Sequence, residues 1–188
     1  MKLEFYPLTQ ERWNDLVILF GKNGACAGCW CTYWRQSSSE FAKNKGTKNK
    51  NKLRKIVNSK QPIGIVAYAE KVPIGWCAIA PREDYPRLSG SRILAPVDDQ
   101  RVWSIVCFFV TRAHRRKGVT RELIKAAAEY AFKKGAKIVE AYPTDISKPQ
   151  PDVFIYTGIG SAFRAVGFKE VERRSPNRPI LRFHIKDI

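Results

Sequence analysis

The chain has 188 residues and lacks a long hydrophobic stretch: the longest, Val102 to Val110, has nine residues and includes Ser104. A helix that spans a membrane needs about 20 apolar residues, so the sequence predicts no membrane span. The first residues also lack the apolar region of a secretory signal, and we expect a soluble cytoplasmic protein without a membrane partner. Hydrophobic residues still make up 44% of the chain, which excludes wholesale disorder.

Acidic residues are scarce. The chain has 17 Asp and Glu against 34 Lys and Arg, a net charge of +17. Such an excess favours anionic partners, namely nucleic acid, an anionic surface or a phosphorylated cofactor. Residues 43–60 contain eight Lys or Arg and no acid, and we interpret them as a solvated helix face or loop whose Asn-Lys repeat packs against nothing. The run also motivates an RNA-directed role, but it contains no aromatic platform, so nucleic acid is not the favoured partner.

The five cysteines include no second Cys pair that would complete a zinc site. Cys26, Cys29 and Cys31 follow one another as Cys-x-x-Cys-Trp-Cys, whereas Cys77 and Cys107 fall in expected strands. Structural zinc needs four ligands, so we assign no metal. Semi-buried thiols that pack a loop are the simplest interpretation. A three-Cys metal site with a distant fourth ligand, and a reactive-thiol role, stay open as alternatives.

The hydrophobic pattern predicts one α/β domain over residues 1–188, with a Cys/Trp-rich and Lys-rich segment at 22–60. Trp13, Leu16, Val17 and Phe20 have helical spacing, and Thr9 could cap their helix. Residues 40–58 are expected as a polar helix or loop and residues 82–100 as a long irregular loop. Further helices are expected at 119–134 and 161–166, and strands at 3–6, 63–69, 74–80, 103–110, 137–142, 168–172 and 180–185.

A basic turn joins the expected central strand to the next helix. It runs Val110-Thr-Arg-Ala-His-Arg-Arg-Lys-Gly118-Val-Thr-Arg121. Free N–H groups and the helix dipole make a helix start an anion site, Gly118 allows a close backbone approach, and the cations add charge-assisted contacts. The residues alone therefore indicate a phosphate or pyrophosphate site. The chain contains no P-loop pattern, and its run Gly158-Ile-Gly160 departs from a dinucleotide fingerprint at Phe163.

Arg115-x-x-Gly118-x-Thr120 resembles the R/Q-x-x-G-x-G/A signature of the GNAT superfamily of N-acetyltransferases, with Thr120 where Gly or Ala is usual. Phe163-x-x-x-Gly167-Phe168 is similar to the end of the family's later L-Y-x-x-x-G-F motif. The resemblance implies a mixed, mostly antiparallel central sheet flanked by helices, and an N-acyltransferase with acetyl-CoA as cosubstrate and an amine as acceptor. It implies cofactor contacts at Phe109, Val110, Arg115, Arg116, Lys117, Gly118, Val119, Thr120, Arg121 and Phe163.

The acid and base are less well marked than the cofactor loop. In many relatives the Tyr of the later motif protonates the departing CoA thiolate, but Phe163 has no proton to donate. Tyr142 and Tyr156 are therefore the alternative donors. A protonated amine cannot attack a thioester, so a general base or a water chain is needed, and Glu140 and the acidic pair at residues 98–99 are its candidates.

The Cys/Trp-rich segment follows the first helix, and in relatives this region borders the acceptor pocket. We therefore expect Trp30 and Trp34 at the substrate. The leading hypothesis is direct attack of the amine on the thioester in a ternary complex, with backbone N–H groups of the central strand polarising the carbonyl. A non-catalytic CoA-binding protein and a basic RNA- or ribonucleoprotein-directed protein on the same fold are the alternatives. The acceptor and the oligomeric state are not fixed by the sequence, and a homodimer stays open.

Overall fold

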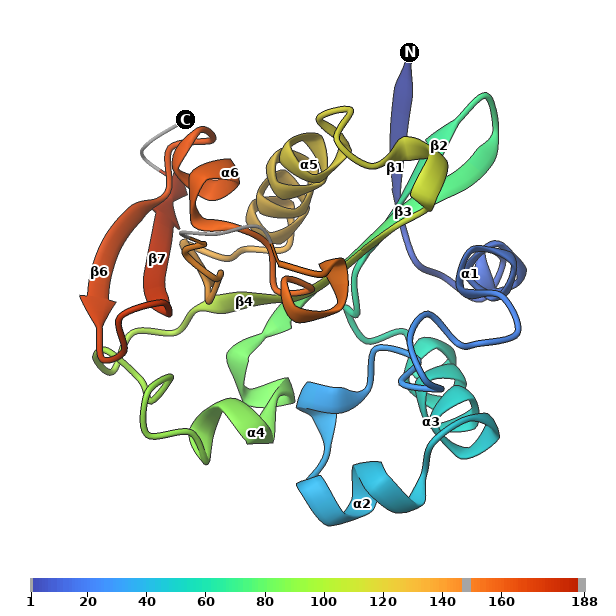
Figure 1. Cartoon of the computed structure of the whole chain (residues 1–188), viewed down its shortest axis with the longest axis horizontal. Helices are drawn as coiled ribbons and strands as arrows, with labels where there is room; N and C mark the ends of the chain where they lie inside the picture. The colour runs from blue at the N-terminus through green and yellow to red at the C-terminus, as the bar shows by residue number, and fades with distance from the viewer. Residues whose placement is uncertain (1, 147–149, 186–188) are drawn as a thin grey trace.

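The computed structural model describes residues 2–146 and 150–185, so residues 1, 147–149 and 186–188 of the expected domain lie outside the described residues. Strands and helices alternate in the order that the hydrophobic pattern predicts (Figure 1). The strands are β1 (Leu3–Pro7), β2 (Ile65–Ala69), β3 (Val72–Pro81), β4 (Trp103–Val110), β5 (Ile138–Ala141), β6 (Lys169–Arg173) and β7 (Pro179–His184). The α-helices are α1 (Trp13–Phe20), α2 (Ser38–Lys43), α3 (Thr47–Asn58), α4 (Pro86–Ser89), α5 (Val119–Lys133) and α6 (Gly160–Arg164). Four 3-10 turns are η1 (Tyr33–Arg35), η2 (Arg82–Asp84), η3 (Arg112–His114) and η4 (Asp152–Phe154).

The seven strands form one sheet in the order β1-β2-β3-β4-β5-β7-β6. Every neighbouring pair is antiparallel except β4 and β5. The parallel pair is short: it runs only from Trp103 opposite Val139 to Ile105 opposite Ala141. This confirms the mixed, mostly antiparallel sheet expected from the sequence, and it leaves the second half of β4 unpaired by β5.

Helices cover both faces of the sheet, and Figure 1 shows α5 and α1 on opposite sides of it. Beneath α5, its buried residues Val119, Leu123 and Ala127 pack into one core with side chains from β2, β3 and β4. A second core on the other face joins α1 and α3 to Trp76 of β3. The segment 22–60 contributes to this second core through Trp30, Cys31, Trp34, Leu53 and Val57.

The first helix begins later than the capping argument predicts. Arg12 N–H bonds the carbonyl of Thr9 in a preceding turn, and α1 starts at Trp13 without a side-chain cap. The Thr9 hydroxyl instead donates to the carboxylate of Glu11, at 3.2 Å. The cap at Thr9 was therefore wrong, because a turn separates it from the helix. The helical spacing itself is confirmed, with Trp13, Leu16, Leu19 and Phe20 buried.

The Lys-rich segment folds as α2 and α3, and one of its asparagines corrects the sequence expectation. Asn49 is fully buried. Its side chain accepts a hydrogen bond from Gln36 at 2.7 Å and donates one to the carbonyl of Gly28 at 3.1 Å. The Asn-Lys repeat was expected to pack against nothing, yet the first of its two asparagines, Asn49, ties α3 to the Cys/Trp-rich segment. The neighbouring Asn51 is exposed, as expected.

Residues 82–100 were expected as irregular loop, but they include η2 and the short α4. Pro86 opens α4 and Leu88 from it is fully buried, so this connection packs on the core of α1 and α3. No helix within residues 2–146 and 150–185 combines the length and the apolar character needed to cross a membrane.

Candidate active site

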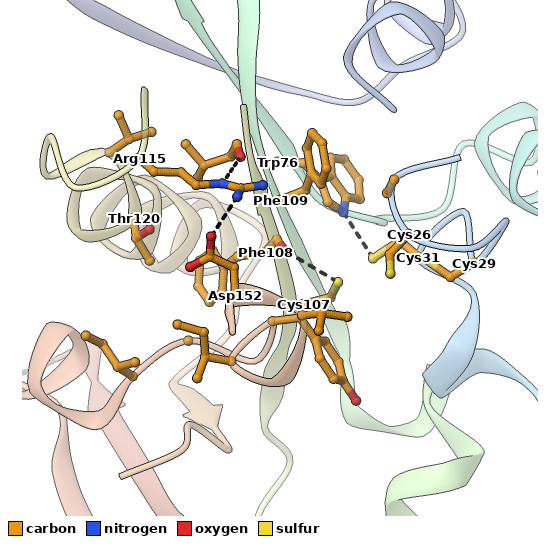
Figure 2. A pocket seen from close by; sticks show the side chains of 18 of the residues that line it. Cys26, Cys29, Cys31, Trp76, Cys107, Phe108, Phe109, Arg115, Thr120 and Asp152 are labelled. Atoms are coloured by element: carbon orange, nitrogen blue, oxygen red, sulfur yellow. Dashed lines mark hydrogen bonds and ion pairs between the residues drawn. The ribbon is translucent and has the colours of Figure 1, made fainter. Parts of the chain in front are cut away.

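A cavity of about 1230 Å³ lies beside the free half of β4. Beyond Ile105, no strand of the described chain pairs with β4 on the side of β5. The cavity walls come mainly from the end of β4 with the turn into α5, from residues 25–34 and from residues 150–159 (Figure 2). A cavity of this size can enclose a ligand of cofactor dimensions.

The turn from β4 into α5 makes one end of the cavity cationic. Gly118 immediately precedes α5 and adopts a left-handed conformation with φ of 80°, and a Cβ built there meets nothing within 4 Å. The side chains of Arg115, Arg116 and Arg121 line this end. The N–H groups of the first helical turn and three guanidinium groups together form a strong anion site, and a phosphate group matches its charge and hydrogen bonding.

Eight of the ten predicted cofactor contacts line the cavity: Phe109, Val110, Arg115, Arg116, Gly118, Val119, Thr120 and Arg121. Lys117 is exposed and is not part of the lining. Phe163 is fully buried and is not part of it either. Its ring meets those of Phe108 and Phe168 edge-on, with centroids 5.9 and 5.1 Å apart. The structure therefore corrects the expected contact at Phe163: an apolar ring in this position supports the core under the cavity.

Two hydrogen bonds hold the free edge of β4. Phe108 N–H donates to the carbonyl of Tyr156 at 2.7 Å. Arg115 Nε donates to the carbonyl of Val110 at 3.0 Å, and its Nη1 pairs with Asp152 at 2.6 Å (Figure 2). A ligand that hydrogen-bonds this part of β4 must replace these protein contacts.

Glu140 and Tyr142 do not line the cavity. Glu140 is 1% exposed, and its two carboxylate oxygens pair with Arg82 at 3.0 Å and with Arg182 at 2.7 Å. The Tyr142 hydroxyl donates to the same carboxylate and bonds Ser104 at 2.9 Å. Burial, together with the negative charge of Glu140, raises the pKa of Tyr142 well above its ordinary value. The expectation that Glu140 faces the cleft is corrected: its carboxylate forms ion pairs with two buried guanidinium groups.

The other acid candidates are also engaged elsewhere. Asp98 forms a bidentate pair with Arg182, at 2.7 and 3.0 Å, and the hydrogen bonds from this guanidinium hold the pKa of Asp98 well below its usual range. Neither Asp98 nor Asp99 belongs to the cavity lining. Within the described part of the lining, Asp152 is the only carboxylate, and Arg115 already pairs with it.

Tyr156 is the one predicted catalytic residue that lines the cavity. It lies in a turn, and its ring centroid is 6.3 Å from that of Tyr33. Burial, and secondarily the neighbouring thiol of Cys107, raises the pKa of Tyr156 above its ordinary value. Its phenol is therefore protonated at neutral pH and can donate a proton into the cavity.

The two tryptophans expected at the substrate have different positions. Trp30 is buried between Trp13 and Phe20, with ring centroids 6.2 and 5.7 Å away, and it is not part of the main cavity lining. Its proposed substrate contact is corrected, because its neighbours are core aromatics. Trp34 lines the cavity and is 6% exposed. Its indole N–H is buried and has no hydrogen-bond partner in the described structure.

Four of the five cysteines line the cavity, namely Cys26, Cys29, Cys31 and Cys107. The indole N–H of Trp76 donates to the sulfur of Cys31 at 3.1 Å (Figure 2). Among the described residues, no three or more Cys, His, Asp or Glu side chains are arranged to hold a metal ion. The Cys-Trp-Cys run is unusual in the sequence, but its contact with Trp76 could not be predicted, because Trp76 is 45 residues from Cys31 and no local signal connects the two.

A hydrogen bond from Cys107 and a second from Trp76 lower the pKa of Cys31, in opposition to burial. The same Cys31–Cys107 contact and burial raise the pKa of Cys107 well above its usual range. Burial also raises the pKa values of Cys29 and Cys77. The cavity thus has a cationic end at the start of α5 and an apolar end lined by thiols, phenols and indoles.

The family model of the acetyltransferase (GNAT) family matches residues 29–149. A search of curated proteins finds no match. Solved structures show the same fold at low sequence identity. The PaiA N-acetyltransferase of Thermoplasma acidophilum, solved with coenzyme A, is 17% identical with a TM-score of 0.55, covering 98% of this chain and 99% of its own.

Two further structures extend the likeness of fold. The aminoglycoside N-acetyltransferase AAC(6')-Iy, bound to a bisubstrate analogue, is 17% identical with a TM-score of 0.54, covering 93% of this chain and 96% of its own. A chain of the NatC complex with Gag peptide and CoA is 12% identical with a TM-score of 0.55, covering 98% and 99% of the two chains.

Proposed function

Because the chain belongs to the acetyltransferase (GNAT) family, we propose that it transfers an acetyl group from acetyl-CoA to the nitrogen of an amine acceptor. The observation that carries this proposal is the continuous cavity that joins the start of α5 to the free edge of β4. Acetyl-CoA has the matching parts: a pyrophosphate, an extended arm with amide groups, and a thioester at the far end.

The residues present fit these parts. The N-terminus of α5, with Arg116 and Arg121 beside it, would hold the pyrophosphate. Gly118 leaves open space where any other residue would place a Cβ. The Val110 carbonyl, on the free edge of β4, would pair with the arm once Arg115 releases it. The unpartnered indole N–H of Trp34 offers a buried donor for a ligand carbonyl.

The reacting end of the site has a donor for each charge that develops. Phe108 N–H, once the carbonyl of Tyr156 moves off it, points from the free edge of β4 and would polarise the thioester carbonyl. The Tyr156 phenol would protonate the departing CoA thiolate, a role that Phe163 cannot fill. In the simplest course the amine attacks the thioester directly while both substrates are bound.

Calorimetric titration with acetyl-CoA tests the cofactor site. Gly118→Glu places a carboxylate at the anion site and should abolish binding. Gly135→Glu is the matched control, because Gly135 also has a positive φ and open space around its Cβ position but follows the other end of α5. This control should bind acetyl-CoA as the wild type does, and circular dichroism should show both variants folded.

An amine screen for CoA release then separates an enzyme from a non-catalytic CoA-binding protein. Release that depends on an amine supports the transferase, whereas tight binding without release by any amine class favours the binding protein. If the wild-type protein does not bind acetyl-CoA, the proposal is wrong, and the basic RNA- or ribonucleoprotein-directed protein becomes the favoured hypothesis.

A further inference from the structure

The apolar end of the cavity lacks an obvious base for direct attack. Within the described lining, the only carboxylate, Asp152, pairs with Arg115, and the only histidine, His114, precedes α5. The His114 ring bonds the Thr111 hydroxyl at 2.8 Å. The apolar end instead contains cysteine thiols: Cys26, Cys29 and Cys31 come from the loop after α1, and Cys107 comes from β4.

Cys31 has the surroundings of a thiolate rather than of a packed thiol. Trp76 donates its indole N–H to the sulfur at 3.1 Å, and this contact and the neighbouring Cys107 lower the pKa of Cys31. The buried guanidinium of Arg35 adds positive charge nearby. Hydrogen bonds and positive charge favour the ionised form, which is the nucleophile. By contrast, the thiol of Cys29 donates to the carbonyl of Gly24 at 3.6 Å and is held as a thiol.

The backbone at this point is also unusual. Cys31 and the preceding Trp30 both have positive φ values, 54° and 45°, which non-glycine residues rarely adopt. Such conformations persist only where the surroundings enforce them. Trp34, three residues further on, lines the same cavity and is 6% exposed. Its indole N–H is buried and has no hydrogen-bond partner among the described residues. A buried donor without an acceptor calls for an explanation, and the oxygen of a ligand in this cavity would supply the acceptor.

We propose that Cys31 is a catalytic nucleophile that carries the acetyl group between acetyl-CoA and the amine. In the first step the Cys31 thiolate attacks the thioester carbonyl, the bond from that carbon to the CoA sulfur breaks, and CoA leaves as a thiol after taking one proton. In the second step the amine attacks acetyl-Cys31, the new C–N bond forms, the bond from the carbonyl carbon to the Cys31 sulfur breaks so that Cys31 leaves as a thiolate, and the proton of the amine goes to the Tyr156 phenolate left by the first step. No oxidant or further reactant is needed.

This inference rests on the proposed acetyl transfer and replaces direct attack by two steps. Trp76 would stabilise the thiolate each time it forms. Tyr156 would supply the proton to the departing CoA sulfur. The second step needs no separate carboxylate, because the Tyr156 phenolate that remains after the first step would be the base for the amine.

The test uses the full chain, reduced, with acetyl-CoA and no amine. Within one turnover time we expect one equivalent of CoA thiol to be released and the intact protein to gain the mass of one acetyl group. Peptide mapping should place that group on Cys31, and hydroxylamine should remove it, since a thioester is labile whereas an acetylated lysine is not. Addition of an acceptor amine should discharge it.

Cys31→Ser should bind acetyl-CoA in the calorimeter but show neither the CoA burst nor the labile acetyl group. Cys29→Ser, two residues away in the same loop, is the matched control and should behave as the wild type. Acetyl-CoA binding without acylation, or Cys31→Ser with wild-type turnover, would overturn the nucleophile while leaving the transferase intact. If the wild type does not bind acetyl-CoA at all, the proposed function itself fails.

Discussion

Replacement of Glu140 by glutamine should destabilise the fold and leave the transfer chemistry unchanged in the protein that stays folded. Glu140 is 1% exposed and pairs with Arg82 at 3.0 Å and Arg182 at 2.7 Å, and both guanidinium groups are themselves buried. Removal of one partner of a buried ion pair costs about 3–5 kcal/mol, because the remaining charge stays buried without compensation. In a chain of this length such a loss lowers the melting temperature by roughly 10 °C.

Thermal melting followed by circular dichroism measures this cost, and acetyl-CoA binding and turnover are compared well below the melting temperature. Asp98→Asn is the matched control, since Asp98 pairs with the same Arg182 but its side chain is 36% exposed. A pair of this exposure contributes less than about 1 kcal/mol, so the control should melt close to the wild type. If Glu140→Gln melts like the wild type but loses turnover, Glu140 acts on the reaction and the structural reasoning is refuted.

Three further outcomes follow from the contacts described above and from one surface carboxylate. Asn49→Ala should lose about 1–3 kcal/mol in urea unfolding, because it leaves buried polar groups unpaired, whereas exposed Asn51→Ala should lose almost nothing. Hydrogen bonds from two arginines lower the pKa of Asp145 from 3.8 to about 2, so its carboxylate stabilises the fold above that ordinary value. This contribution, at most about 2 kcal/mol, is lost as the pH falls from 3.8 towards 2; Asp145→Asn should therefore be less stable than the wild type at neutral pH and equal to it in acid. Asp152→Asn should bind acetyl-CoA about two- to fivefold more tightly in calorimetry, because it frees Arg115 and removes a negative charge beside the phosphate site.

Local signals in the sequence predict the fold and the cofactor loop well. The apolar run of β4, the glycine at 118 and the helical spacing of α5 are each visible within a few residues, and each is confirmed as a structural element. The anion site also follows from local features, because the N–H groups and the cations that form it are neighbours in the sequence. Its use for acetyl-CoA stays a prediction.

The roles of the polar core residues could not be predicted in this way. Glu140 was considered a base because an acid on a strand beside the central one can face a cleft. Its actual partners, Arg82 and Arg182, are 58 and 42 residues away, and nothing local distinguishes a buried ion pair from a surface acid. Asn49 shows the same limit within a charged run, since its partner Gln36 lies 13 residues earlier, directly after η1.

The position of Cys107 beside Cys31 depends on one extra residue in β4. In a regular strand alternate residues share a face, so Cys107 would lie with Ile105, on the α5 side of the sheet. The pairing of β3 and β4 shifts between Ala78 and Ile79, which lie opposite Cys107 and Ile105, and Val106 is the residue left over. Such a bulge re-aims the following side chains.

After the bulge, Cys107 and Phe109 join the core that contains Trp76 and Cys31, whereas Phe108 packs on the side of α5. Without the extra residue, Cys107 would face α5 and the cavity would lose the thiol that bonds Cys31. A bulge leaves no mark in hydrophobic periodicity when both faces of a strand are apolar, as they are in β4. Because the side chains on both faces of β4 are apolar, the sequence shows that β4 is a central strand. For the same reason the sequence does not show the bulge, and the position of Cys107 at the apolar end of the cavity could not be predicted.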